Sequence, residues 1–297
     1  MAEPLSPRLL ALLALGIVSI AFASILIRAA DAPALSVAFY RNLGAAAILL
    51  PIALVRHPDQ FRSLSRREWG TALLAGALLA VHFGSWVPSL ALTTVAASTV
   101  LVDTQPVWVA IIERAMGVRV PGRAVVGIAL AVLGAVLISG GDFAVSGKAV
   151  LGDLLALLGA VAGAGYIVAG RRLRQVVSLT TYTGIVYSTC AVLLAGAVAV
   201  SGAPFTGFTG KQWGLLALMT LIPQFGGHTV FNYLLGQLEA GTVAIAVAGE
   251  PVVASVLAFM FFDEVPGWAA VAGGIAILAG IWVVIRAQGR ARTGPAG

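Results

Sequence analysis

A small set of polar side chains stands inside long apolar stretches of the sequence, and their chemistry has to be explained first. The ionisable members are Arg41, His82, Asp103, His228 and Glu250, and the amides are Asn42, Gln105, Gln224 and Asn232. An ionisable side chain in an apolar environment is costly unless it is paired or solvated. Each of them is therefore a candidate for binding a polar solute or for moving a proton.

Two groups of polar side chains have the spacing of one helical face. The first group, at i, i+4 and i+8, comprises Gln224, His228 and Asn232. The second group, at i, i+3, i+4 and i+7, comprises His82, Ser85, Trp86 and Ser89. Such spacing places each group on one side of a helix, and we expect the two stripes to face each other across a central cavity. Hydrogen bonding to neighbouring helices is the alternative, and the sequence leaves both open.

Two Xaa-Pro pairs, Gln105-Pro106 and Glu250-Pro251, fall in the middle of apolar segments. Proline removes one helical hydrogen bond and frees the carbonyl group four residues earlier. Among lipid tails this is tolerated only beside protein or a wet cavity. We therefore expect Pro106 and Pro251 to mark hinges or gates, with a simple structural kink as the alternative.

Charged and aromatic side chains indicate what such a cavity could bind. Arg41 could hold a carboxylate, reach the membrane surface or pair with Glu250. Glu250 could instead relay protons, and together with Asp103 and aromatic rings it could accept a cation. Trp86 is the best candidate for stacking on a substrate side chain, and Trp108 is a further candidate lining residue.

The elements that must position these residues are membrane-spanning helices. The chain has 297 residues, of which 60% are hydrophobic and 10% charged, and its mean hydropathy is +1.00. A soluble domain of this length cannot bury so much apolar surface, whereas helices of about 20 apolar residues span a bilayer. Ten spans are expected, at 8–29, 34–55, 70–90, 95–114, 122–140, 152–170, 179–200, 212–234, 242–262 and 267–286.

Basic residues gather on one side of the predicted spans. With the N-terminus in the cytoplasm, 14 of the 18 basic residues fall in inner segments, and three, Arg28, Lys148 and Lys211, fall in outer loops. This positive-inside pattern predicts a multi-pass protein of a bacterial-type inner (plasma) membrane, with both termini cytoplasmic. It also accounts for the net charge of +6, so nucleic acid is not an expected partner.

The sequence contains an internal repeat. Gln105-Pro106-Val107 recurs as Glu250-Pro251-Val252 at an offset of 145, and three further landmarks recur at an offset of 146: His82 as His228, Gly127 as Gly273, and Gly134 as Gly280. The repeat predicts two halves, 1–146 and 147–297, of five spans each. An odd number of spans inverts the second half, the plan of many secondary transporters. We therefore expect an all-α integral membrane carrier with a central cavity.

These landmarks resemble the EamA-type repeat of the drug/metabolite transporter superfamily. The similarity lies in the run from Ala91 to Ser98 followed by Gln105-Pro106-Val107-Trp108, and in Gly249-Glu250-Pro251-Val252 followed by Asp263-Glu264. One departure is Arg119, which stands where the family usually has the acidic residue matched by Glu264. The resemblance implies a ten-helix exporter of small metabolites, similar to exporters of amino acids, including aromatic ones.

Other classes of protein leave signatures that this sequence lacks. No GxxxxGK[ST] phosphate loop, HExxH metal motif or nucleophile elbow is present, so no catalytic residue, cofactor or metal is expected. A membrane-embedded enzyme is the alternative from another class, while carriers of organic cations, drugs, or sugar and nucleotide derivatives are alternatives within transport. The expected partners are a small-molecule substrate and the lipid bilayer, and the sequence leaves monomer and homodimer open.

Overall fold

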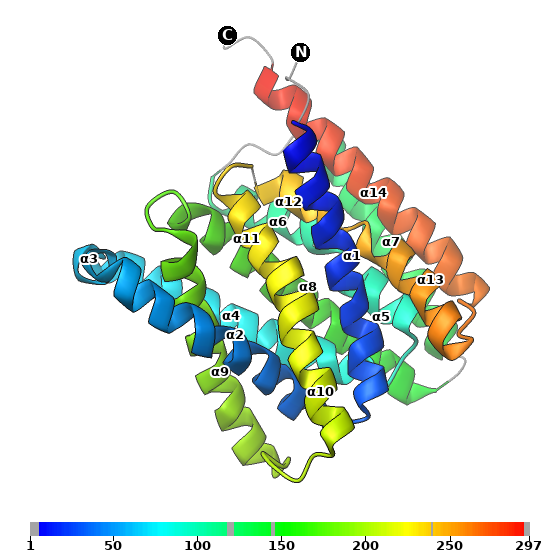
Figure 1. Ribbon diagram of the computed structural model, residues 1–297. Helices are drawn as coiled ribbons and strands as arrows, with labels where there is room; N and C mark the ends of the chain where they lie inside the picture. Colours follow the sequence, from blue (N-terminus) through cyan, green and yellow to red (C-terminus); the bar gives the residue numbers. More distant parts are fainter. Residues whose placement is uncertain (1–5, 118–121, 144–145, 239, 294–297) are drawn as a thin grey trace.

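The computed structural model describes residues 6–117, 122–143, 146–238 and 240–293, and these residues form helices and connecting turns without a strand (Figure 1). The helices of the first half are α1 (Pro7–Ala30), α2 (Ala34–Arg56), α3 (Pro58–Ser63), α4 (Arg66–Ser89), α5 (Val95–Val102), α6 (Gln105–Ala115) and α7 (Gly122–Phe143). Those of the second half are α8 (Gly147–Leu173), α9 (Leu179–Ser201), α10 (Gly210–Met219), the π-helix η1 (Thr220–Thr229), α11 (Val230–Leu235), α12 (Ala240–Val247), α13 (Glu250–Phe262) and α14 (Trp268–Thr293).

Seven helical segments among the described residues are long and apolar enough to cross a membrane. They are Pro7–Ala30, Ala34–Arg56, Arg66–Ser89, Val95–Ala115, Gly147–Leu173, Leu179–Ser201 and Gly210–Leu235. Shorter apolar helices occupy Val125–Leu137, Glu250–Phe262 and Trp268–Val283. The chain is therefore a multi-pass helical membrane protein, and ten spans remain a prediction.

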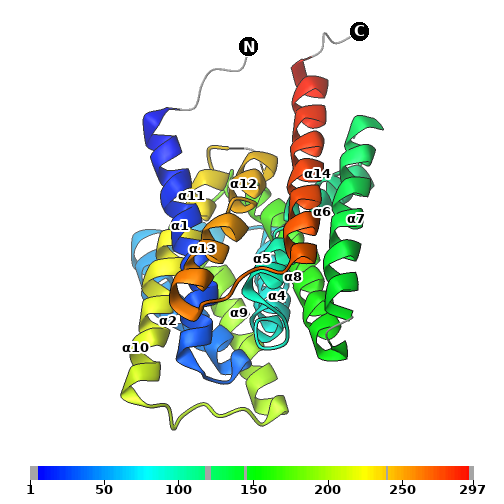
Figure 2. The same cartoon turned by 90° about the vertical axis from the view of Figure 1, so that its right-hand side faces the viewer.

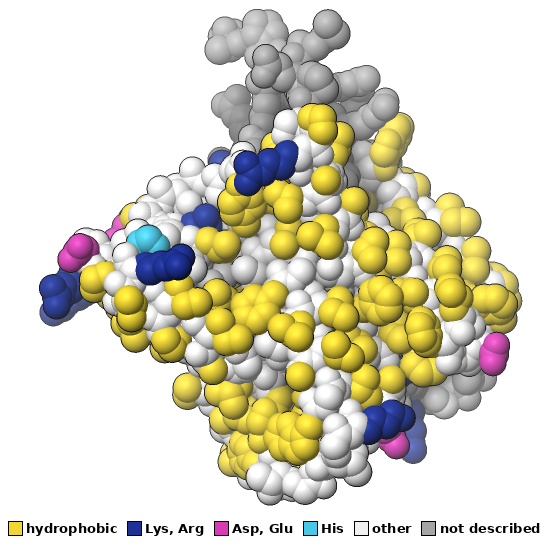
Figure 3. All heavy atoms as spheres, viewed as in Figure 1, with side chains coloured by type: hydrophobic (Ala, Val, Ile, Leu, Met, Phe, Trp, Pro, Cys, Tyr) yellow, Lys and Arg dark blue, Asp and Glu magenta, His cyan; other side chains and the backbone are white. Residues whose placement is uncertain are grey.

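Large apolar side chains cover much of the outer surface, as expected where lipid replaces water. Val55, Val200 and Trp268 are 81%, 92% and 79% exposed. Figure 3 shows apolar side chains spread over the face in view, with charged side chains towards its edges. The start of α1 and the end of α14 lie at the same end of the molecule in Figures 1 and 2.

Glycines join α7 to α14, which run side by side in both ribbon views. A Cβ atom on Gly134 would lie 2.5 Å from the carbonyl oxygen of Gly273, and one on Gly280 would clash with the carbonyl oxygen of Gly127. Small residues allow this close backbone approach between helices in lipid. The contact is reciprocal: the repeat relates Gly134 to Gly280 and Gly273 to Gly127, so the two close approaches are equivalent.

Two helices are interrupted at equivalent places. The break between α5 and α6 falls at Asp103 and Thr104, and the break between α12 and α13 falls at Ala248 and Gly249. The prolines that follow lie in the first turn of α6 and of α13, where the missing N–H group has no helical partner to lose. The alternative of a simple kink inside a continuous helix does not hold, because each helix ends and a second one begins. The hinge or gate role of the two prolines stays a prediction.

Candidate functional site

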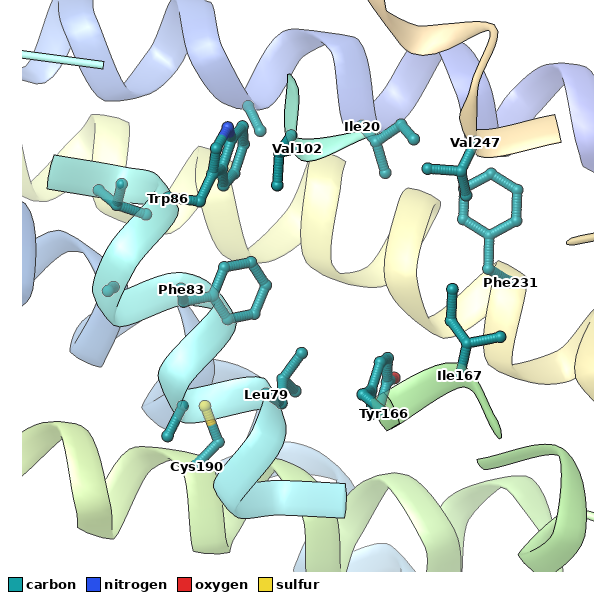
Figure 4. Close-up of a cluster of buried hydrophobic side chains, with 14 of the residues drawn as sticks. Ile20, Leu79, Phe83, Trp86, Val102, Tyr166, Ile167, Cys190, Phe231 and Val247 are labelled. Carbon is teal, nitrogen blue, oxygen red and sulfur yellow. The ribbon is translucent and has the colours of Figure 1, made fainter. Parts of the chain in front are cut away.

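A small cavity lies where α1, α4, α5, α6, α8, η1, α11, α12 and α13 meet. Seven of the side chains singled out from the sequence line it: His82, Trp86, Asp103, Gln105, His228, Asn232 and Glu250. The rest of the wall is mainly apolar and aromatic. Figure 4 shows Trp86, Tyr166 and Phe231 around a common centre, with Ile20, Val102 and Val247 beside them.

The two repeat-related histidines meet at this cavity. The ring centroids of His82 and His228 are 6.2 Å apart, and the His82 ring lies 6.0 Å from that of Trp86 in a stacked arrangement. His82 Nδ1 is 2.8 Å from the carbonyl oxygen of Gly159, so the proton of that ring is on Nδ1 and Nε2 is left for another partner. Glycine is needed in α8 because a Cβ atom on Gly163 would lie 3.0 Å from the same Nδ1 atom.

Two buried carboxyl groups line the cavity, and each has one oxygen without a hydrogen-bond partner among the described residues. Asp103 is 2% exposed and Glu250 is 5% exposed, and each stands at one of the two helix breaks. Asp103 Oδ2 and Glu250 Oε1 have no hydrogen-bond partner among the described residues. Glu250 also makes no ion pair within the described residues, so the Arg41–Glu250 salt bridge considered from the sequence is not formed. Uncompensated buried carboxyl groups suit a cationic guest or a bound proton.

Arg41 is fully buried and lies behind the cavity wall rather than in it. Its Nε atom donates to Gln224 Oε1 at 2.9 Å, and its Cζ atom stands 4.2 Å from the centroid of the Phe83 ring. Its two terminal nitrogens, Nη1 and Nη2, have no hydrogen-bond partner among the described residues. The idea that Arg41 reaches the membrane surface was therefore wrong. Phe83 in turn contacts the cavity residue His228, with ring centroids 5.0 Å apart.

The predicted stripe on the eighth span is divided between two environments. Gln224 does not line the cavity and donates from Nε2 to Asn42 Oδ1 at 3.2 Å. Asn232 lines the cavity and accepts from the Tyr166 hydroxyl at 2.7 Å. The π-helical turns of η1 have more residues per turn than an α-helix. The i, i+4, i+8 pattern therefore no longer marks a single face.

Other predicted lining residues serve packing instead. Ser89 donates to the carbonyl oxygen of Trp86 at 2.6 Å and is 2.7 Å from Ser98 Oγ. The indole N–H of Trp108 donates to Thr104 Oγ1 at 3.1 Å, across the turn in which α6 begins. Neither Ser89, Trp108, Pro106 nor Pro251 lines the cavity. No three His, Cys, Asp or Glu side chains in the described part of the chain converge to hold a metal ion.

Comparison with known proteins identifies the family. A family model described as the EamA-like transporter family matches the chain twice, over residues 7–140 and 150–286. The chain belongs to the EamA-like transporter family. No curated protein matches it. A solved structure titled only as the crystal structure of a protein has a TM-score of 0.65 and 16% identity, covering 93% of this chain and 96% of the other, so it supports the fold alone.

Membership of the EamA-like family means that the protein is a membrane transporter of small molecules. Its site includes two rings that sequence patterns did not single out, those of Phe83 and Phe231. Phe83 directly follows His82, and Phe231 directly precedes Asn232, so adjacency to a polar candidate was the available signal. Arg119, the departure from the family pattern, lies outside the described residues.

Proposed function

We propose that this EamA-like transporter exports amino acids, including aromatic ones, by alternating access across a bacterial inner membrane. Ten helices in two inverted halves, 1–146 and 147–297, would supply the two states, with both termini in the cytoplasm. Two matches of one family model within the chain support the two halves. The reciprocal contacts of Gly134 with Gly273 and of Gly280 with Gly127 support a pseudo-two-fold axis between them.

The substrate class rests on the charges around the histidine pair. Asp103 and Glu250 present carboxyl groups without partners in the cavity, and Arg41 holds two unpartnered guanidinium nitrogens behind the ring of Phe83. A zwitterion satisfies both, because its ammonium group matches the carboxyl groups and its carboxylate matches the guanidinium fork. The rings of Trp86 and Phe231 offer flat apolar surfaces for an aromatic side chain. This pairing of unsatisfied charges carries the proposal.

For the carboxylate to reach Arg41, Phe83 has to move aside. In the structure its ring lies against the guanidinium plane, 4.2 Å from Cζ, and also contacts the ring of His228. A cation–π contact is weaker and less directional than a bidentate ion pair. We therefore assign to Phe83 the role of a replaceable partner, which shields Arg41 when the cavity is empty.

A carrier of organic cations is the second candidate. It is favoured by the observation that the two carboxyl groups line the cavity and Arg41 does not. In this alternative Arg41 is structural, joining α2 to η1 through Gln224. Amines with aromatic groups would then bind between the carboxyl groups and Trp86.

Counterflow in proteoliposomes distinguishes the two. Vesicles containing the purified protein are preloaded with unlabelled phenylalanine or with 2-phenylethylamine, which has the same ring and ammonium group but no carboxylate. We expect preloaded phenylalanine to accelerate uptake of labelled phenylalanine. Acceleration by the amine alone would assign the protein to cation transport, and no exchange across an amino-acid panel would refute the substrate class.

A further inference from the structure

Arg28, in the last turn of α1, ties together segments that are distant in sequence. It forms an ion pair with Glu264, which lies between α13 and α14. Its Nε atom also donates to the carbonyl oxygen of Leu90 at 3.2 Å, and Nη2 donates to that of Thr93 at 2.7 Å. Glu264 accepts from the backbone N–H of Val95 at 2.7 Å. The ion pair and this last bond join the second half of the chain to the first.

This cluster stands between the cavity and a crevice at the same end of α1. Ile27, Arg28, Leu90 and Thr93 are among the residues that line the crevice. Ala23 lines the cavity, and Ile27 is one helical turn further along α1. The predicted topology places this end outside the cell. The cavity is therefore separated from the outer crevice by about one turn of helix, at the level of Arg28.

At the opposite end of the cavity an arginine bonds a backbone carbonyl group. Ile167 and Leu235 line the cavity, and one turn beyond Ile167 the guanidinium of Arg171 donates to the carbonyl oxygen of Leu235 at 3.1 Å. Leu90 and Leu235 are 145 residues apart, as are Arg119 and Glu264. The position equivalent to Glu264 thus carries a basic residue. The bond of Arg171 stays within the second half of the chain, whereas the Arg28–Glu264 pair crosses between halves.

We propose that the Arg28–Glu264 pair is an outer latch, which holds the cavity closed to the outside. The proposal rests on the alternating-access part of the proposed function and is independent of the substrate. A latch that joins the halves at the outer end stabilises the state closed at that end. Breaking it shifts the population towards the outward-open state, by an amount set by the free energy of the pair.

Accessibility of a cavity cysteine tests the latch without any substrate. Cys190 is buried and is the single cysteine of the chain, so a C190A background carrying A23C has one thiol at the cavity wall. Intact cells expressing this protein are treated with a membrane-impermeant thiol reagent. Glu264→Gln removes the charge and keeps an oxygen for the Val95 amide. We expect it to raise the labelling rate about five-fold, the ratio that corresponds to about 1 kcal/mol.

Neighbouring and opposite-end variants provide the controls. Asp263→Asn removes an exposed charge one residue away, and asparagine tolerates the left-handed backbone of Asp263 (φ 53°). It should leave labelling unchanged, and so should Arg171→Gln, which alters the opposite end. Arg28→Gln should raise the labelling rate at least as much as Glu264→Gln, because it removes the ion pair and also the bonds to Leu90 and Thr93, and the double variant should not exceed Arg28→Gln by more than experimental error.

The latch is refuted if Glu264→Gln labels at the rate of Asp263→Asn. Equal acceleration by Arg171→Gln would also overturn it, since the effect would then be a general loosening. Size-exclusion elution and thermal unfolding identify variants that fail to fold, and Arg28→Gln then serves as the deciding variant. Failure of amino-acid exchange together with faster labelling would refute the substrate class and leave the latch in place.

Discussion

Replacing Arg41 by glutamine tests the proposed recognition of a carboxylate. In the proposed complex the two terminal nitrogens of Arg41 gain hydrogen bonds to the substrate carboxylate, and each charge-assisted bond contributes about 1.5–3 kcal/mol. Against this gain stands the loss of the contact with Phe83, 4.2 Å from Cζ, which contributes about 2 kcal/mol in a desolvated site. The net contribution is about 1–4 kcal/mol, or about 5- to 850-fold in affinity.

The assay compares two inhibitors of labelled phenylalanine exchange in proteoliposomes. Phenylalanine should lose about 5- to 850-fold in potency against Arg41→Gln, whereas 2-phenylethylamine, which lacks the carboxylate, should change little. Arg41→Lys keeps the charge but not the planar fork, so we expect an intermediate loss. Because Arg41 also bonds Gln224, thermal unfolding must show that each variant is folded.

Two results would refute the reasoning. If Arg41→Gln weakens the amine as much as the amino acid, the guanidinium acts on the shape of the site and not on the carboxylate. If neither inhibitor changes, Arg41 has no part in binding, and its bond to Gln224 is its whole role.

Two further predictions follow from the junction of the halves. Replacing His82 or His228 by alanine should reduce the rate of substrate exchange more than it reduces the protein yield or the thermal stability, because both rings line the cavity. Wild-type exchange rates in well-expressed variants would assign both rings to packing alone. Replacing Gly134 by alanine should destabilise the protein by about 1–3 kcal/mol, because the added Cβ atom would lie 2.5 Å from a carbonyl oxygen. The control is the same change at Gly196, where an added Cβ atom would have nothing within 4 Å. That change should lower the melting temperature little or not at all.

The location of the site was predictable because it depends on the repeat. The offset of 146 between His82 and His228 suggested that the two rings meet, and their centroids are 6.2 Å apart. The paired prolines likewise marked two interruptions at equivalent places. Periodicity and repeat spacing are properties of the sequence alone. The meeting of the two histidine rings and the positions of the two helix breaks could therefore be predicted without tertiary information.

The features that sequence reasoning missed depend on local helix type and on tertiary contact. The π-helix over Thr220–Thr229 contains Pro223 and two adjacent glycines, and a Cβ atom on Gly226 would lie 2.7 Å from Ser19 Oγ in α1. Close approach to α1 thus accompanies the altered turn, which moves Gln224 towards Arg41. Residue spacing interpreted with α-helical geometry cannot predict this change in the position of Gln224. The contact of Arg41 with Phe83 joins residues of two helices and has no signature in either segment.

Arg28 and Arg41 differ in how fully their guanidinium groups are hydrogen-bonded. This difference distinguishes an arginine with a structural role from one that can bind a ligand. Each guanidinium nitrogen of Arg28 has a partner: Leu90, Thr93 or Glu264. Such a group stabilises one arrangement of the chain and offers nothing to a guest. Arg41 has one hydrogen-bonded nitrogen and two without partners, although it is fully buried.

Leaving a buried charged donor unsatisfied costs more than an ordinary hydrogen bond returns. The cost is recovered when a ligand supplies the missing acceptors, and this recovery contributes to the binding energy. A carrier can use the same difference to distinguish its loaded and empty states, since the carboxylate that satisfies Arg41 also frees Phe83 to turn away.

Phe83→Leu therefore separates the effect of the Phe83 ring on substrate binding from its effect on the stability of the empty protein. Without a competing ring, phenylalanine should bind at least as tightly as in the wild type, while the empty protein should unfold at a lower temperature and regain stability when phenylalanine is added. Weaker binding of phenylalanine to a folded Phe83→Leu variant would show that the ring assists recognition and does not compete with it.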